Sequence, residues 1–149
     1  MRPQSDDRCR VVAHFHDGRV LKGTTQDFAP NNTTFHLFTD GDETAEPLEV
    51  PIGALKALFF VKTWDGDSNR VDDNRFRLVS GRGRRMLVTF ADGEVMAGFT
   101  MGYGLNKPGF FLVPADPKSN NARVFVVTSA VTRVEFVMAS NPAFAAGAA

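Results

Sequence analysis

The sequence predicts an all-β fold made of two tandem five-stranded small barrels that are related by internal duplication. The first observation is a repeated pattern, because residues 15–23 and residues 90–98 both hold an aromatic residue, an Asp-Gly pair and a second glycine at the same spacing. The second is that each copy holds five short strand-like segments separated by evenly spaced turn signals. The third is that almost no helix is expected. This combination is typical of a small β-barrel.

The repeat also predicts the domain boundaries. The copies align from residue 10 to 61 and from residue 85 to 137, a period too long for a solenoid unit. The 149-residue chain is therefore divided into a first barrel at 9–61, a charged linker at 62–84, a second barrel at 85–138 and a flexible tail at 139–149. A domain of about 60 residues buries only some 60% of its unfolded surface, so we expect the copies to pack face to face in one compact unit.

An Asp-Gly pair predicts the first hairpin of each copy. In the first copy, residues 9–15 are rich in β-branched and aromatic side chains, Asp17 and Gly18 form a two-residue turn of type I′, and residues 19–27 return. The second copy repeats this arrangement with a strand, a turn and a strand at 86–90, Asp92-Gly93 and 94–101. A glycine recurs inside both second strands, at Gly23 and Gly98, and indicates a bend or a bulge that curls the sheet.

The remaining elements follow in the same order in both copies. The first copy continues with strands at 34–38, 48–50 and 56–61 and with a short helical turn at 52–55. The second copy continues with strands at 110–113, 123–127 and 133–137 and with a helical turn at 129–131. One further short strand is expected inside the linker, at 75–79.

Composition narrows the class of protein. The formal net charge is zero, which removes the long-range attraction expected of a protein that lives on nucleic acid or on an anionic membrane. The single cysteine, Cys9, excludes an intrachain disulfide framework and fits a reducing cytoplasm. No apolar run approaches the roughly 20 residues needed to cross a bilayer. We therefore expect a soluble cytoplasmic protein.

Each copy resembles an Sm-like (SH3-like) small β-barrel. The resemblance lies in an apolar strand, an Asp-Gly pair, a second glycine and a later aromatic, which are Phe15, Asp17, Gly18, Gly23 and Phe28 in one copy and Phe90, Asp92, Gly93, Gly98 and Tyr103 in the other. Over its whole length the chain is also similar to a group of uncharacterised bacterial tandem-domain proteins. The Sm resemblance implies a barrel topology and edges that can self-associate.

The RNA pocket of Sm proteins is not carried over by this resemblance. The aspartate that follows the loop aromatic in RNA-binding Sm proteins is replaced by Ala29 in one copy and by Gly104 in the other. The arginine-glycine pair that precedes their last strand is also missing, because residues 51–53 and 128–130 stand there instead. The resemblance therefore implies the fold without the base-binding site.

A run of arginines is the first candidate site. Five arginines, without an intervening acidic residue, form a patch that suits RNA phosphates or a nucleotide: Arg75, Arg77, Arg82, Arg84 and Arg85. The alternative is a solvated linker whose arginines pair with the aspartates that precede them, which is the usual fate of surface charge runs. The binding hypothesis assigns the phosphate contacts to three of these arginines, which lie close to glycines: Arg82, Arg84 and Arg85.

A loop and a set of histidines are further candidates. Within residues 102–111, a stacking or peptide-docking surface is predicted from Leu105, Asn106, Lys107 and Phe111, whereas Tyr103 and Phe110 are expected in the core. His14 and His16 share one face of a strand and His36 lies on a later strand, so a three-nitrogen metal site is a weaker hypothesis. The alternative for the histidines is a solvated outer face.

The function predicted from the sequence is a non-enzymatic binding or scaffolding module. No nucleophile and base stand in a recognisable pattern, so we expect neither an enzyme nor a cofactor. A small open barrel leaves main-chain groups unpaired on its outer strands, and a protein partner is expected to dock on these strand edges or in the inter-barrel groove. The same edges allow a homo-oligomer. The alternative function is RNA or nucleotide-phosphate binding through the patch from Arg75 to Arg85.

Overall fold

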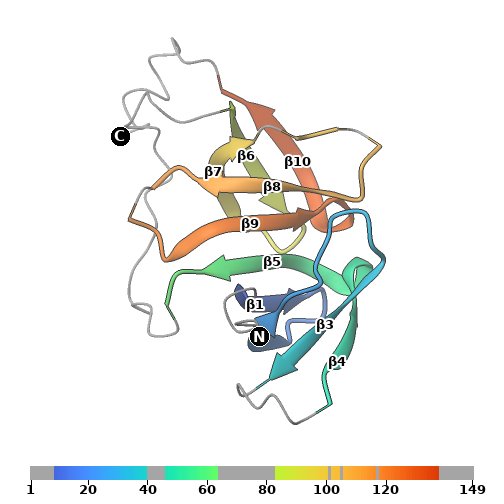
Figure 1. The fold of residues 1–149 in the computed structure, drawn as a ribbon. Coiled ribbons are helices and arrows are strands. Elements are labelled where there is room, and N and C mark those ends of the chain that lie inside the picture. The colour runs from blue at the N-terminus through green and yellow to red at the C-terminus, as the bar shows by residue number, and fades with distance from the viewer. Residues whose placement is uncertain are drawn as a thin grey trace.

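The computed structural model describes residues 9–39, 46–63, 83–100, 102–104, 106–116 and 118–137. Within these ranges the protein is all-β, as predicted, and its strands form one antiparallel sheet (Figure 1). The predicted strand at 75–79, most of the linker and the tail at 139–149 lie outside the described residues. Among the described residues there is no helix that is long and apolar enough to span a membrane.

The ten strands of the described residues fall into two series with the same internal order. The first series is β1 (Cys9–Phe15), β2 (Val20–Thr25), β3 (Thr34–Thr39), β4 (Leu48–Pro51), the 3₁₀ turn η2 (Ile52–Ala54) and β5 (Leu55–Val61). The second is β6 (Arg84–Phe90), β7 (Val95–Thr100), β8 (Gly109–Pro114), β9 (Asn121–Val127), the 3₁₀ turn η3 (Thr128–Ala130) and β10 (Val131–Phe136). The sheet order is β10-β6-β7-β8-β9-β5-β1-β2-β3-β4, so that the fifth strand of each series lies beside its first.

The hairpins after β1 and β6 form where the Asp-Gly pairs predict them, but with a different loop. Phe15 N–H donates to the carbonyl of Arg19 (2.9 Å), and Gly18 N–H donates to the carbonyl of Phe15 (3.1 Å). Three residues therefore lie in the loop, and Gly18 alone supplies the positive φ, +93°. This is the three-residue hairpin whose last position is left-handed, so the predicted two-residue type I′ turn was wrong. Gly93 repeats the geometry at φ +95°.

The two series are joined edge to edge by β5 and β9. These strands pair antiparallel, with Leu58 opposite Phe125 and Phe59 opposite Val124. The prediction that the copies pack face to face was wrong, because the sheet runs without interruption from one series into the other. Both strands carry continuous apolar runs, the pattern expected of strands that are covered on both faces. Residues 57–60 of β5 and 124–127 of β9 are accordingly all buried.

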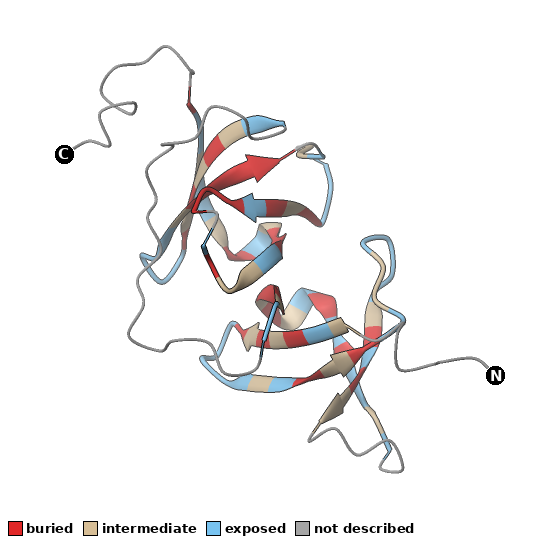
Figure 2. Cartoon of the chain, turned by 60° about the vertical axis from the view of Figure 1, so that its left-hand side comes forward, coloured by how far each residue is buried: buried red, intermediate tan, exposed pale blue. Residues whose placement is uncertain are grey.

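Alternate residues of the junction strands enter two different cores. Leu58 and Phe60 pack with the first series, whereas Ala57 and Phe59 pack with Met86, Val88 and other residues of the second. The exchange is mutual, because β9 contributes Phe125 and Val127 to the core of the first series. Figure 2 shows buried positions alternating with exposed ones along strands in both halves of the molecule.

An ion pair adds a second link across the junction. The side chain of Lys56, on β5, is only 12% exposed and donates to Asp92 Oδ2 (2.7 Å) and to Glu94 in the β6–β7 hairpin. Burial acts to lower the pKa of Lys56, but the hydrogen bonds to both carboxylates outweigh it, so its pKa is raised. The equivalent hairpin of the first series pairs internally instead, Arg19 with Asp17.

The strand glycines permit a close approach of two strands. A Cβ built on Gly23 would lie 2.4 Å from the carbonyl oxygen of Phe38, and one on Gly98 would lie 2.4 Å from that of Val113. The pairing of β1 with β2 and of β6 with β7 is regular through these positions, so the expected bulge is not there. The irregularities lie instead where β5 and β10 meet the first strand of their series, and near the end of the β5–β9 pairing, between Phe60 and Val61.

Candidate binding surfaces

An open sheet exposes two outer strands, which here are β4 and β10. They lie at opposite ends of the strand order, with β10 in the upper part of Figure 1 and β4 in the lower part. Within the described part of the chain no other strand pairs with the outer side of either. Unpaired main-chain groups on such strands invite a further strand, unless side chains or prolines prevent it.

Prolines block the outer side of β4. Ile52 N–H donates to the carbonyl of Thr33 (2.9 Å), which fixes the alternation along the β3–β4 ladder. The main-chain groups of Val50 therefore turn toward β3, and those of Glu49 and Pro51 turn outward. Pro51 has no N–H to offer, and Pro47 occupies the next outward position before the strand. The outer side of β4 thus presents one N–H where a regular strand would present three.

The equivalent positions on β9 carry no proline. In the alignment of the two copies, Pro47, Glu49 and Pro51 correspond to Arg123, Phe125 and Val127, whose N–H groups are available for pairing. These residues face β5 in the junction. The difference explains why the fourth strand of the second series lies inside the sheet whereas that of the first series lies at its margin.

Among the described residues, none pairs with the outer side of β10. Val137 N–H donates to the carbonyl of Arg85 (2.9 Å), so the main-chain groups of Glu135 and Arg133 face β6 and those of Val134 and Phe136 face outward. No proline interrupts this strand. Four of its six residues are exposed, and Phe136 is 38% exposed although it is large and apolar. This strand is the better candidate for docking.

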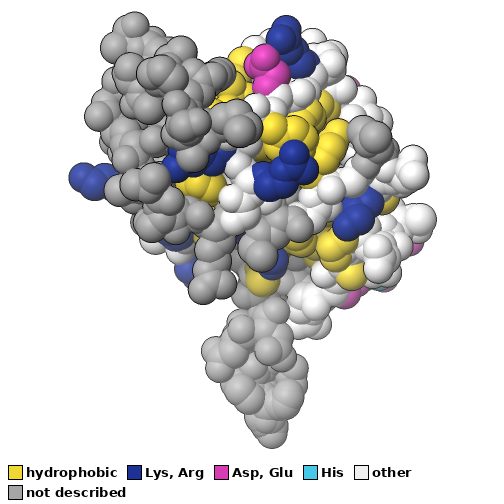
Figure 3. Space-filling view, turned by 90° about the horizontal axis from the view of Figure 1, so that it is seen from above, with side chains coloured by type: hydrophobic (Ala, Val, Ile, Leu, Met, Phe, Trp, Pro, Cys, Tyr) yellow, Lys and Arg dark blue, Asp and Glu magenta, His cyan; other side chains and the backbone are white. Residues whose placement is uncertain are grey.

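Aromatic and charged side chains surround the end of β10. The Arg84 guanidinium lies over the Phe136 ring, 3.6 Å from its centroid, and the Tyr103 ring contacts Phe136 edge to face at 5.6 Å. Arg133 Nη2 lies 2.8 Å from Glu135 Oε2 on the same strand. Figure 3 views the end of the molecule that is uppermost in Figure 1 and shows apolar side chains between lysine and arginine side chains.

The predicted arginine patch is only partly described. Arg84 stacks on Phe136, and Arg85 lies half-buried in β6, where its carbonyl accepts the bond from Val137. The other arginines of the patch lie outside the described residues: Arg75, Arg77 and Arg82. The cation–π contact of Arg84 was not predicted, because no local pattern places residue 136 beside residue 84.

The predicted loop surface divides into exposed and packed residues. Asn106 and Lys107 are exposed, and Lys107 Nζ donates to the carbonyl of Gly102 (3.1 Å). Phe111 is half-buried and contacts the rings of Phe28, Phe60 and Phe125. Leu105 lies outside the described residues. Phe110 is in the core, 3% exposed, as predicted.

Sequence reasoning missed an arginine at the junction. The Arg123 guanidinium lies 4.4 Å from the centroid of the Phe60 ring and 4.3 Å from that of Phe111. It covers part of an aromatic cluster to which both series contribute: Phe28, Phe60, Phe111 and Phe125. The β5–β9 register places Arg123 opposite Phe60, and nothing in the local sequence indicates that register.

The three histidines have separate partners. The His14 ring packs against Phe59 at 4.6 Å, and burial, followed by the charge of Lys56, lowers its pKa. His16 Nε2 lies 3.3 Å from Ser129 Oγ. No group of three metal-ligating side chains occurs among the residues described, so the structure does not bring His14, His16 and His36 into a metal site.

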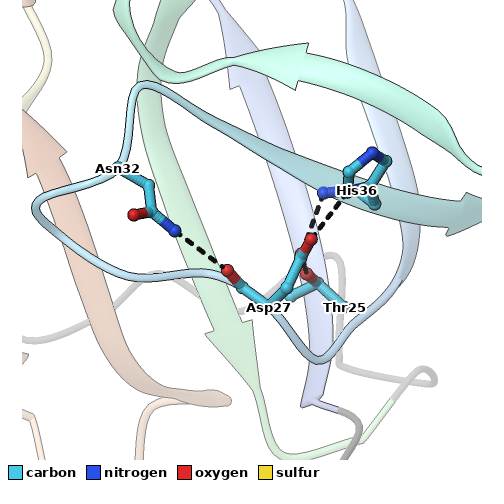
Figure 4. A network of polar contacts seen from close by, with 4 residues as sticks. All are labelled: Thr25, Asp27, Asn32 and His36. Carbon is cyan, nitrogen blue, oxygen red and sulfur yellow. Dashed lines mark hydrogen bonds and ion pairs between the residues drawn. The ribbon is translucent and has the colours of Figure 1, made fainter.

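His36 belongs to a polar network around Asp27 (Figure 4). One Asp27 oxygen lies 2.6 Å from His36 Nδ1, and the other accepts bonds from His36 N–H (2.9 Å) and Thr25 Oγ1 (3.2 Å). Asn32 Nδ2 donates to the Asp27 carbonyl (3.4 Å). Thr25 donates to the carboxylate and not to the imidazole, so these residues do not form a nucleophile–base pair. The network fixes the β2–β3 loop against β3.

Comparison with protein families gives one assignment. Residues 7–138 match a family of unknown function, DUF6982. The chain belongs to the DUF6982 family. The matched region contains every strand from β1 to β10, so both series and the β5–β9 junction lie within one DUF6982 unit. No curated protein and no solved structure matches the chain.

Proposed function

We propose that this DUF6982 protein is a non-enzymatic binding or scaffolding module that recognises a protein partner through the outer side of β10. The observation that carries the proposal is the open ladder of Val134 and Phe136, set against the proline-blocked margin at β4. An extended segment of the partner adds to β10 as a further, antiparallel strand. Main-chain hydrogen bonds supply affinity, and the side chains of Arg133, Glu135 and Phe136 supply specificity.

The proposed architecture consists of two tandem SH3-like or Sm-like barrels that share the β5–β9 junction. The repeated strand order and the irregular pairing of each fifth strand support it, because bulges curve a sheet toward closure. The inter-barrel groove is the weaker docking site, since β5 pairs directly with β9 where the two series meet and the apolar side chains of both strands are buried. The free Cys9 supports a cytoplasmic location.

The alternative partner is an RNA or nucleotide phosphate bound through the patch from Arg75 to Arg85. Of the described patch residues, Arg84 already stacks on Phe136, which supports a role in shaping the β10 margin. Phosphate binding weakens steeply with salt, whereas strand addition barely responds to it. Salt dependence therefore separates the two proposals.

The test compares wild-type protein with Val134→Pro, after gentle purification from native cells. Proline at Val134 removes an outward N–H and is tolerated on an outer strand. Glu49→Pro is the matched control, because it removes an outward N–H from β4. Native mass spectrometry is expected to find a complex that forms with the wild type and with Glu49→Pro and that is lost from Val134→Pro.

Two results would contradict docking on β10. A partner retained by Val134→Pro places the binding site elsewhere. Nucleic acid absorbance that disappears at high salt, and that falls in an Arg84→Ala and Arg85→Ala variant, supports the phosphate alternative instead.

A further inference from the structure

We infer that the partner of β10 is β10 of a second copy of this chain, in an antiparallel dimer whose two-fold axis passes through Val134. This inference rests on the proposed function, because it names the occupant of the same strand edge. In this register Val134 lies opposite Val134 of the partner subunit, and Arg133 lies opposite Glu135 of the partner subunit. The resulting sheet continues from one copy into the other.

The backbone of β10 fits this register. The outward main-chain groups belong to Val134 and Phe136, so the two-fold axis falls on a hydrogen-bonded pair in which each Val134 donates to and accepts from the other. Positions 133 and 135 then form non-hydrogen-bonded pairs, whose side chains come closest across an antiparallel ladder. No proline stands in the paired segment.

Charge disfavours the two neighbouring registers of the same strand. Moving the axis to Arg133 or to Glu135 would place like charges opposite each other, which disfavours those registers. With the axis at Val134, each arginine faces a carboxylate, and two ion pairs form across the interface. In the single chain the same two side chains pair only along their own exposed strand, at 2.8 Å.

The junction inside the chain is a precedent for the interface. β5 corresponds to β10 in the repeat, and Leu58 corresponds to Val134. The outer side of β5 already holds an antiparallel strand, β9, with Leu58 opposite Phe125. Val134 packs against the core of the second series, as Leu58 packs in the first. The dimer would extend an apolar face across the axis in the same way.

The assembly closes at two copies. A two-fold interface uses the same edge on both subunits and leaves no second copy of it open. The only other outer strand described is β4, where Pro47 and Pro51 remove two of three outward donors. Growth into a ring or filament through β4 is therefore disfavoured.

The experiment is a charge swap followed by sedimentation velocity over a range of protein concentrations. Arg133→Glu places carboxylates opposite carboxylates, and Glu135→Arg places arginines opposite arginines. Each variant alone is expected to raise the dimer Kd at least about tenfold, because an interface with like charges opposed loses more than 1.4 kcal/mol. An equimolar mixture of the two variants is expected to restore dimers, since every opposed pair then has opposite signs.

The controls test whether a change in the mass of the sedimenting species comes from the interface and not from loss of folding. Both substituted side chains are exposed, so circular dichroism spectra and melting temperatures are expected to match the wild type. Lys22→Glu reverses the charge of an exposed residue on β2 and is expected to leave the dimer Kd unchanged. Val134→Pro is expected to abolish the dimer without either charge change.

The outcomes separate self-pairing from the broader proposal. A wild type that stays monomeric at every concentration, or single variants that dimerise as the wild type does, overturn the dimer. If such a monomer still captures another protein, and Val134→Pro releases it, docking on β10 stands with a different occupant. If Val134→Pro changes neither self-association nor capture, both proposals are wrong.

Discussion

Asp27 and His36 form a charged pair that exists only in the first series. In the aligned second copy, Gly102 and Phe111 occupy the equivalent positions. The hydrogen bond to Asp27 raises the pKa of His36 above 6.5. Burial acts to raise the pKa of Asp27, but hydrogen bonds from His36 and Thr25 outweigh it and hold this pKa below 3.8. The pair is therefore fully charged in a window of mildly acidic pH.

Stability from this pair is predicted to depend on pH. The raised pKa of His36 means that its contribution is complete below 6.5 and is lost as the pH rises through the folded value. The lowered pKa of Asp27 means that its contribution is complete above 3.8 and is lost as the pH falls through the folded value. The melting temperature of Asp27→Asn is thus expected to fall furthest below wild type between about pH 4 and 6.5, and less at about pH 9.

Asp17→Asn provides the control for this titration. Asp17 pairs with Arg19, which stays charged throughout the range, so its effect on the melting temperature is expected to be constant from about pH 5 to 9. An Asp27→Asn difference that is equally constant would contradict a contribution from His36.

Gly98 is predicted to tolerate no side chain. A Cβ at this position would lie 2.4 Å from the Val113 carbonyl oxygen and 2.6 Å from Leu112 Cγ. Because one of these contacts is main chain, relief requires β7 and β8 to separate. Gly98→Ala is expected to lower the free energy of unfolding by about 2–3 kcal/mol in urea titrations.

Gly53→Ala is the matched control for overcrowding. Nothing lies within 4 Å of a Cβ built on Gly53, and its φ is not left-handed. This substitution is expected to change the free energy of unfolding by less than about 0.5 kcal/mol. Equal effects at Gly53 and Gly98 would show that loss of backbone freedom, and not the approach of β8, governs these sites.

Pro47 and Pro51 are predicted to keep the margin at β4 unpaired. Each of them lacks the N–H that its β9 counterpart has. Replacing both by valine restores a regular donor pattern on the outer side of β4. In sedimentation velocity, the Pro47→Val and Pro51→Val double variant is expected to form larger, concentration-dependent assemblies than the wild type.

The control retains one of the two prolines. A single Pro51→Val change leaves Pro47 in place and is expected to increase self-association less than the double variant. A double variant that sediments as the wild type would mean that the prolines do not limit pairing at β4.

The shared junction predicts that the two halves unfold together. Phe125 belongs to the second series but is fully buried in the core of the first. Phe125→Ala is expected to lower the free energy of unfolding by about 3–5 kcal/mol, because the truncated side chain leaves a cavity. Thermal unfolding is expected to remain one transition, and hydrogen exchange is expected to accelerate in β1 and β2 as well as in β8 and β9.

Val113→Ala serves as the control on a strand beside the junction. Val113 is 50% exposed, and its truncation is expected to lower the free energy of unfolding by less than about 0.5 kcal/mol. Two separate transitions in Phe125→Ala, with the first series unaffected, would contradict a jointly stabilised molecule.

The strands could be predicted because their signals are local. Alternating apolar residues, Asp-Gly turns and the repeat define β1 to β10 to within a few residues, and the structure confirms an all-β chain. The loop type at Gly18 was predicted wrongly, and the close approach of β8 to Gly98 was not predicted. Both depend on which backbone atoms lie nearby, which for Gly98 are those of β8.

The candidate sites were less predictable than the strands. Phe110 was assigned to the core correctly, but Phe111 packs at the junction and Arg84 stacks on Phe136. These contacts join residues that are far apart in the sequence. A side chain's chemistry is readable from its type, whereas its neighbours depend on how the strands are ordered.

The sequence by itself predicted the duplication, and it determined the strand positions and the absence of prolines from β9 and β10, because the last two are properties of neighbouring residues. Only the tertiary structure decided that β5 pairs with β9 and that β4 and β10 lie outermost. Several pairings satisfy the same apolar pattern, and the choice among them depends on burying β5 on both faces while leaving the proline-bearing β4 at the margin.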